Sequence, residues 1–295
     1  MKNKLSGLGV AMITPFQTDG KIDYKGLEKL TNYLIQGEVD YLVVQGTTGE
    51  NVTLSEEEKQ DVLQFVVEVN KGRKPIVYGV GGNNTASIVK KLSTLNTAGV
   101  DAILSVSPYY NKPSQEGIFQ HFQAVCEASP LPVILYNVPG RTGSNMQVST
   151  TIRIAQNCPN AVAIKEASGD VMQIMQVVRE APESFLVISG DDGITLPLLA
   201  TGCHGVISVI GNAFPREFSS LVRHALNGDF SKALPIHHRL FDLYSALFTE
   251  GNPAGVKEVL HFLNICSNHT RLPLVPVSEK HSQFLYKILA EQGLN

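Results

Sequence analysis

Eight short apolar segments, each followed by a stretch whose apolar residues recur at helical spacing, constrain the fold of this chain more than any other feature. The segments are residues 9–14, 41–44, 75–80, 102–106, 132–136, 161–165, 185–189 and 205–209. Short continuous apolar runs are typical of strands buried on both faces of a parallel sheet. Parallel strands need helical crossovers, and eight strands close a barrel. The pattern therefore predicts an α/β fold, a (β/α)8 barrel of the TIM type.

A doubly wound open sheet is the alternative architecture. It would favour a glycine-rich phosphate turn after the first strand, whereas this chain has Thr14, Pro15 and Phe16 there. From Phe214 onward the strand pattern stops and apolar residues recur at helical spacing. We therefore expect a catalytic barrel over residues 1–213 and a helical C-terminal extension, including the last barrel helix, over residues 214–295.

Composition excludes several classes of function. The chain has 295 residues and a formal net charge of −3 without a polybasic run, so neither nucleic acid nor an anionic membrane is an expected partner. No apolar run is long enough to span a bilayer, and the N-terminal residues lack the apolar region of a signal peptide. The four cysteines are scattered singly and show no metal-ligand spacing. We expect a reduced, cytoplasmic protein.

Lys165 is the last residue of the sixth segment, directly after the apolar residues Ala161 to Ile164. Burying an ammonium group costs several kcal/mol unless the group is paired or loses its proton. One interpretation is a lysine that leaves the sheet and extends its amine into solvent. The other is a neutral amine that attacks a carbonyl and forms a Schiff base.

Polar residues follow the predicted strands at the end where barrel enzymes carry their sites. They are Thr47, Thr48, Tyr109, Tyr110, Tyr136, Arg141, Lys165, Gly190, Asp191 and Asp192. Taken singly, each has a structural interpretation: a threonine in a turn, a tyrosine packed at a strand end, a solvated arginine, an aspartate that caps a helix. Together, an amine, hydroxyls that relay protons and a guanidinium that suits a carboxylate are what an imine-forming aldolase needs. No Asp, Glu or His set has metal-ligand spacing, which disfavours a metal-dependent aldolase.

Three segments carry a family resemblance. They are Gly-Thr-Thr-Gly-Glu at 46–50, Tyr-Asn-Val-Pro-Gly-Arg-Thr at 136–142 and Ile-Lys-Glu at 164–166. The chain resembles the dihydrodipicolinate synthase family over essentially its whole length. That family belongs to the pyruvate-dependent class I aldolases and lyases, which also include N-acetylneuraminate lyase. The turn with Arg141 is the more specific element, because the sialic acid lyases are similar elsewhere and lack that arginine.

The resemblance implies a lyase that condenses pyruvate with L-aspartate 4-semialdehyde in lysine and diaminopimelate biosynthesis. Lys165 would form the imine with pyruvate, and Tyr136 would be the nearest acid and base. Thr47 and Tyr110 would complete a hydroxyl relay, with Tyr110 reaching in from a neighbouring subunit. No separate cofactor is implied, because the lysine imine is the electron sink. The family is usually a homotetramer built from two tight dimers.

The remaining site roles also come from the resemblance. Thr48, with its backbone N–H, would hold the pyruvate carboxylate, and Arg141 would bind the carboxylate of the second substrate. The backbone carbonyl of Ile207 and the turn at Gly190 would line the pocket beside the amine. Two alternatives stay open: another pyruvate-dependent aldolase with a different aldehyde, such as a sugar-acid or sialic acid lyase, and a silent barrel that binds keto acids.

One departure from the family concerns regulation. Lysine-inhibited members bind lysine in a cleft at the tight-dimer interface with a small residue, two histidines, an asparagine, a glutamate and a tyrosine. The matching positions here are Val52, Glu56, Lys59, Asn83, Ser87 and Tyr109. Both histidines and the glutamate are replaced, so the resemblance predicts a degenerate lysine site. Glu56 and Lys59 also have the spacing of an exposed helical pair.

Overall fold

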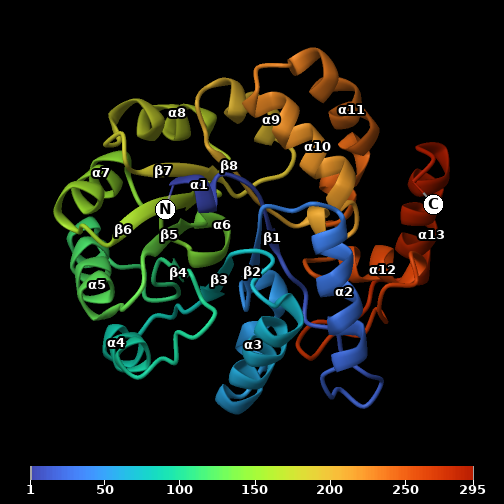
Figure 1. Ribbon diagram of the computed structural model, residues 1–295, viewed down its shortest axis with the longest axis horizontal. Coiled ribbons are helices and arrows are strands. Elements are labelled where there is room, and N and C mark those ends of the chain that lie inside the picture. The colour runs from blue at the N-terminus through green and yellow to red at the C-terminus, as the bar shows by residue number, and fades with distance from the viewer. Residues whose placement is uncertain (1, 295) are drawn as a thin grey trace.

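Eight parallel strands form a closed barrel in the computed structural model, which describes residues 2–294 (Figure 1). The strands are β1 (Gly7–Ala11), β2 (Tyr41–Val44), β3 (Ile76–Gly79), β4 (Ala102–Val106), β5 (Val133–Asn137), β6 (Ala161–Glu166), β7 (Leu186–Ser189) and β8 (Gly205–Ser208). Each pairs with the next along the chain, and β1 pairs with β8. The predicted (β/α)8 barrel with a helical C-terminal extension is confirmed, and the open doubly wound sheet is excluded.

Two glycines let the barrel close between β1 and β8. Gly7 and Gly205 are register partners, and a Cβ atom on Gly205 would lie 2.1 Å from the Gly7 carbonyl oxygen. Gly7 has a φ of +94°, and a Cβ there would lie 2.1 Å from Asp40 Oδ2. No L side chain fits either position, so glycine is required for this strand pairing.

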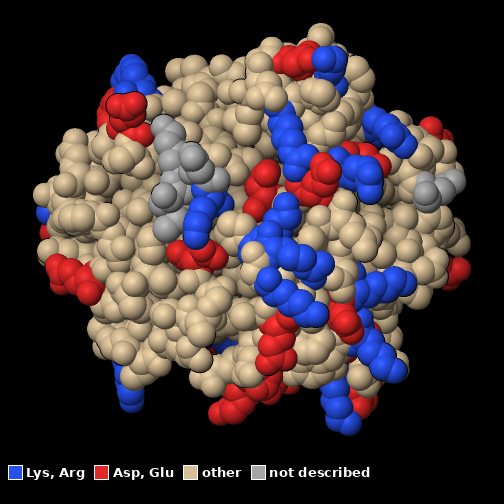
Figure 2. Space-filling model, in the orientation of Figure 1, with Lys and Arg blue, Asp and Glu red and all other residues tan. Residues whose placement is uncertain are grey.

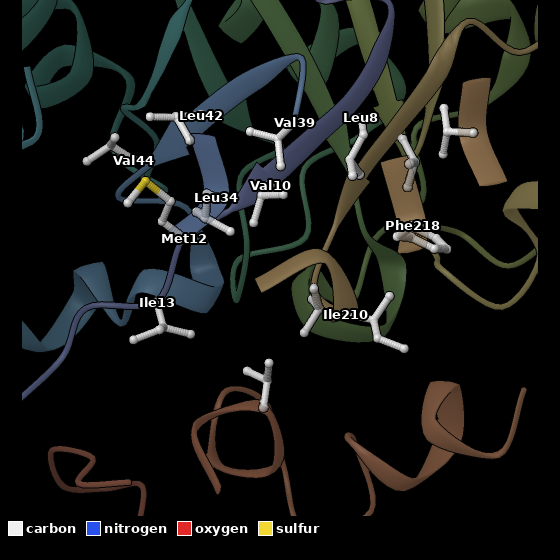
Figure 3. Packing of buried hydrophobic residues seen from close by; sticks show 14 of the residues in the cluster. Leu8, Val10, Met12, Ile13, Leu34, Val39, Leu42, Val44, Ile210 and Phe218 are labelled. Atoms are coloured by element: carbon white, nitrogen blue, oxygen red, sulfur yellow. The ribbon is translucent and has the colours of Figure 1, made fainter. Parts of the chain in front are cut away.

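Alternate residues along a strand point to opposite faces of the barrel wall and belong to two different apolar clusters. Tyr41 and Val43 of β2 belong to the cluster inside the barrel, whereas Leu42 and Val44 belong to the larger cluster between the barrel and its helices. Figure 3 shows part of the outer cluster, where Leu42 and Val44 lie near Leu34 of α2. Both faces of the strands are buried, and this is why both faces are apolar.

Helices surround the barrel (Figure 1). They are α1 (Lys2–Leu5), α2 (Tyr24–Gln36), α3 (Glu56–Asn70), α4 (Thr85–Ser93), α5 (Gln115–Ala128), α6 (Pro139–Thr142), α7 (Val148–Asn157), α8 (Val171–Glu180), α9 (Thr195–Ala200), α10 (Pro215–Leu226), α11 (Phe230–Ala246), α12 (Ala254–Phe262) and α13 (Glu279–Glu291). The capping signals read from the sequence are present: Asp23 accepts from the Gly26 N–H, and Ser55 and Glu58 form a capping box.

Most strand bounds differ from the predicted ones by one residue at an end, and the larger differences are at the N-terminus and after β5. β1 covers residues 7–11 rather than 9–14, because beyond Met12 the backbone leaves the strand ladder and the Ile13 N–H donates to Asn212 Oδ1 at 3.2 Å. The short helices α1 and α6 were not predicted, since four residues give no periodic pattern. Leu5 of α1 is fully buried in the cluster inside the barrel.

The helices after residue 213 lie in two different places. α10 lies in the ring of helices between α9 and α2, while α11, α12 and α13 gather at one side of the barrel (Figure 1). The division into residues 1–213 and 214–295 stays a prediction.

On the face shown in Figure 2, Lys and Arg side chains are interspersed with Asp and Glu. Among the described helices, none has the length and apolar character needed to span a bilayer.

Candidate active site

Lys165 lies near the C-terminal end of β6, with its register partners Tyr136 on β5 and Ile188 on β7. Both partners belong to the cluster inside the barrel. The Lys165 side chain is only 6 % exposed, and its Nζ lies 4.4 Å from the centroid of the Tyr136 ring. The lysine therefore does not extend into solvent. Its amine and a phenol ring meet in the mouth of an apolar barrel.

Gly190 and Ile207 border the same space. Gly190 follows β7, and a Cβ atom there would lie 2.6 Å from Ala167 Cβ and 3.0 Å from Lys165 Cε. A larger residue would therefore push the lysine stem. Ile207, on β8, is buried in the cluster inside the barrel. Both residues lie where they can line a pocket beside the amine.

Thr47 and Thr48 begin a single turn of 3-10 helix, η1 (Thr47–Gly49), directly after β2. Thr48 is 3 % exposed, and its Oγ1 accepts a hydrogen bond of 3.0 Å from Asn252 Nδ2. Thr14 Oγ1 donates to the Gly49 carbonyl at 2.7 Å and ties the turn to the end of β1. The predicted carboxylate-binding threonine thus has a buried partner that the sequence analysis missed.

Arg141 and Tyr110 lie on the outer part of this rim. Arg141 is exposed on α6, which follows β5. Tyr110 follows β4 with a φ of +74° and is 89 % exposed, and its N–H donates to the Thr142 carbonyl at 3.4 Å. A tyrosine in the left-handed region is strained and uncommon. The two loops therefore touch, and they present a guanidinium and a phenol to solvent.

Glu166 lies on the other side of β6 from the amine. Its carboxylate is 1 % exposed and accepts from Asn137 Nδ2 at 3.1 Å, from the Ser168 N–H at 2.8 Å and from Gln173 Nε2 at 3.2 Å. Burial raises the pKa of this carboxyl group. These bonds join the ends of β5 and β6 to α8, so Glu166 and Asn137 hold the strand ends that carry Tyr136 and Lys165.

The interpretation of Asp191 and Asp192 as helix caps is wrong. Helix α9 begins at Thr195 without a side-chain cap. Asp192 Oδ2 instead accepts from the Val209 N–H at 3.0 Å and the Ile210 N–H at 2.8 Å, and burial raises its pKa to about 6. Asp191 Oδ1 accepts from the Gly193 N–H. Asp192 therefore fixes the loop that follows β8 and Ile207.

Four of the six predicted lysine-site positions line one cleft of about 1110 Å³ between α3 and α4: Glu56, Lys59, Asn83 and Ser87. The two oxygens of Glu56 bind Lys59 Nζ at 2.6 Å and Lys91 Nζ at 2.7 Å. Asn83 Nδ2 donates to the Tyr109 carbonyl at 3.3 Å. Val52 is 79 % exposed on the turn η2 (Asn51–Thr53) and does not line the cleft. The predicted ion pair between Glu56 and Lys59 is therefore present, and Glu56 also pairs with Lys91.

Within residues 2–294, no group of three or more His, Cys, Asp and Glu side chains is arranged to hold a metal ion. All four cysteines are free thiols, and three of them are buried.

Comparison with known proteins gives consistent matches over nearly the whole chain. The model of the dihydrodipicolinate synthetase family matches residues 4–292. A 4-hydroxy-tetrahydrodipicolinate synthase from Parabacteroides distasonis is 57 % identical over 272 residues, which cover 92 % of each chain. One from Phocaeicola vulgatus is 53 % identical over 276 residues, 94 % of this chain and 93 % of the relative. The crystal structure of a chloride-inhibited dihydrodipicolinate synthase from Acinetobacter baumannii complexed with pyruvate has a TM-score of 0.95 at 39 % identity, over 99 % of this chain and 100 % of that one.

Proposed function

The chain belongs to the dihydrodipicolinate synthetase family and is an enzyme, a lyase, and we propose that it condenses pyruvate with L-aspartate 4-semialdehyde through an imine on Lys165. The observation that carries the proposal is Lys165, a residue only 6 % exposed at the end of a barrel strand, whose Nζ lies 4.4 Å from the centroid of the Tyr136 ring. An amine held in an apolar mouth beside a phenol suits attack on a keto carbon.

The chemistry runs in four steps. Lys165 Nζ attacks the keto carbon of pyruvate, and water leaves as the imine forms. The imine loses a proton from the pyruvate methyl group and becomes an enamine. The enamine carbon then attacks the aldehyde of the second substrate, whose oxygen takes up a proton as the imine forms again. Finally, the amino group of that substrate attacks the imine carbon, which closes a ring and releases the Lys165 amine. Tyr136 exchanges the protons, and Thr47 and Tyr110 relay them to solvent. The imine takes up the electron pair in the second step, so we propose that no separate cofactor takes part.

Two carboxylates need separate partners in this scheme. Thr48 is buried at the N-terminal turn of η1, which supports its role with the pyruvate carboxylate. Arg141 is exposed at the mouth, which supports its role with the carboxylate of the incoming aldehyde. The Ile207 carbonyl and the turn at Gly190 would line the pocket between them.

We also propose that the enzyme is a homotetramer built from two tight dimers and acts in the cytoplasm. The 89 % exposure of Tyr110 supports a dimer in which this tyrosine enters the site of the neighbouring subunit. The free cysteines support a reducing compartment.

Trapping with borohydride tests the proposal. Incubation with pyruvate and borohydride should inactivate the enzyme and add the mass of a reduced pyruvyl group, which peptide mapping should locate at Lys165. Lys165→Ala should fold normally and lose activity by about a thousandfold or more. Lys232→Ala is the control and should keep full activity, because Lys232 lies on α11 with its side chain 66 % exposed and pairs with the N-cap residue Asp229. A label on another lysine, or near wild-type turnover in Lys165→Ala, would refute the mechanism.

A panel of aldehydes tests the second substrate. Aspartate semialdehyde should give the highest kcat/KM, and preference for a sugar aldehyde would instead identify another pyruvate aldolase. Trapping without turnover on any aldehyde would identify a barrel that only binds keto acids.

A further inference from the structure

A residue of the C-terminal extension reaches the turn after β2 in the barrel mouth. Asn252 Nδ2 donates to Thr48 Oγ1 at 3.0 Å, although the two residues are 204 positions apart in the sequence. Asn252 is 7 % exposed and Thr48 is 3 % exposed, so the bond is shielded from water. In a buried site such a bond orients both groups strongly.

The segment that carries Asn252 is firmly held. It precedes α12, and Lys257, five residues further along the chain, forms a buried ion pair of 2.5 Å with Glu50, in the same loop as Thr48. The second oxygen of Glu50 accepts from the Arg271 N–H at 3.0 Å. Thus two independent bonds join α12 and its N-terminal segment to the turn that carries Thr48.

The direction of the bond determines what the Thr48 hydroxyl can do. An amide nitrogen only donates, so Thr48 Oγ1 must accept from Asn252 and its own hydrogen must point elsewhere. A threonine hydroxyl without this partner rotates between staggered positions and can turn its hydrogen to nearby backbone carbonyls. With Asn252 in place, the hydroxyl hydrogen is available to a ligand.

We propose that Asn252 is a positioning residue that presents the Thr48 hydroxyl as a donor to the carboxylate of pyruvate. This rests on the proposed function, in which Thr48 holds that carboxylate. Asn252 Oδ1 is buried and has no partner within residues 2–294. An asparagine kept for stability alone is expected to bond through both ends, because an unpaired buried acceptor is costly. The bond it does make is the one to Thr48.

The test measures pyruvate binding at the lysine, separately from the aldehyde. The extent of borohydride trapping at Lys165 is recorded against pyruvate concentration. Asn252→Ala should raise the half-saturating concentration by about tenfold, since one hydrogen bond to a charged group becomes poorly oriented. The KM for the aldehyde should stay within about twofold of wild type, which a general loss of structure would not produce.

A variant of nearly the same shape reverses the polarity of the contact. In Asn252→Asp the carboxylate only accepts, so it would draw the Thr48 hydrogen to itself and place a negative charge near the substrate carboxylate. The half-saturating concentration should rise further, by about a hundredfold. If Asn252→Ala is not stably folded at the assay temperature, Asn252→Asp still tests the proposal. Asn268→Ala is the control, because Asn268 Nδ2 bonds Glu258 at 2.7 Å within the C-terminal extension, and it should match wild type.

A double-mutant cycle identifies the route of the effect. Thr48→Val should raise the half-saturating pyruvate concentration by itself, and adding Asn252→Ala should change it by less than about twofold. The proposal would be overturned if the two changes multiplied their effects on the half-saturating pyruvate concentration. It would also be overturned if both Asn252 variants had the same half-saturating concentration as wild type. Failure of the wild-type enzyme to label at any pyruvate concentration would instead refute the proposed function.

Discussion

At the scale of single residues, the rim carries two groups suited to a carboxylate, and they differ in exposure. Thr48 is buried and bonded by Asn252, whereas Arg141 is exposed on the short helix α6. A buried hydroxyl gives a fixed direction, while an exposed guanidinium gives charge over a wider range of positions. The first suits a substrate held covalently at Lys165, and the second suits one that arrives later from solvent.

Replacement of Arg141 tests this division of roles. Because the side chain is exposed, we expect Arg141→Ala to cost about 1.4 kcal/mol, or roughly a tenfold rise in the KM for aspartate semialdehyde. The KM for pyruvate should change by less than about twofold. Steady-state kinetics with each substrate varied in turn provide the measurement.

Arg179→Ala is the matched control, since Arg179 is 71 % exposed on α8 and pairs with Glu180 in the same helix. It should leave both KM values unchanged. Equal rises in both KM values for Arg141→Ala would mean that the arginine has a structural role.

At the scale of elements, the loop after β2 depends on α12. Glu50 has a φ of +53°, is 2 % exposed, and pairs with the fully buried Lys257. Burial lowers the pKa of the Lys257 ammonium group, which the Glu50 charge opposes. The pair therefore holds a strained residue of the turn after β2 against the extension.

Removing one partner of this pair should destabilise the protein strongly. Lys257→Met leaves the Glu50 carboxylate buried without its cation, and we expect a loss of about 3–5 kcal/mol in the free energy of unfolding. Adding Glu50→Gln should recover part of that loss, because no buried charge then remains. Urea denaturation of the two variants checks both values.

The exposed pair Lys287 and Glu291 on α13, with side chains 69 % and 58 % exposed, is the control. Lys287→Met should change the free energy of unfolding by less than about 1 kcal/mol. A similarly small change in Lys257→Met would show that the buried pair does not hold the loop.

Features that depend on residues adjacent in the sequence, such as strand bounds, could be predicted well. β2 and β4 have the predicted bounds, because each is a continuous apolar run, and Lys165 could be recognised as a charge at the end of such a run. The structure shows that its amine stays buried. The roles of Asn252 and Asp192 could not be predicted, because their bonds cross 204 and 18 positions and leave no periodic pattern. Family resemblance suggested the residue roles at the rim, and those roles stay predictions.

At the scale of the whole molecule, the cleft between α3 and α4 decides how a regulator could act. The resemblance implies that this cleft meets a second subunit at the tight-dimer interface, where inhibited relatives bind lysine. Here Lys59 and Lys91 occupy both oxygens of Glu56. Ser87 is exposed on α4 where those relatives have a glutamate. The cleft therefore offers a cationic ligand no free carboxylate at these positions and two competing ammonium groups.

Lysine should for this reason inhibit weakly or not at all at millimolar concentration. Losing one charge-assisted partner and gaining a like charge each cost on the order of 1–3 kcal/mol, or roughly ten- to a hundredfold in affinity. Initial rates at saturating pyruvate against lysine concentration provide the measurement. The triple variant Glu56→His, Lys59→His, Ser87→Glu restores the residues of inhibited relatives and should increase sensitivity. Half-maximal inhibition of the wild type well below a millimolar would contradict the prediction, and would mean that Glu56 leaves its lysines to bind the ligand.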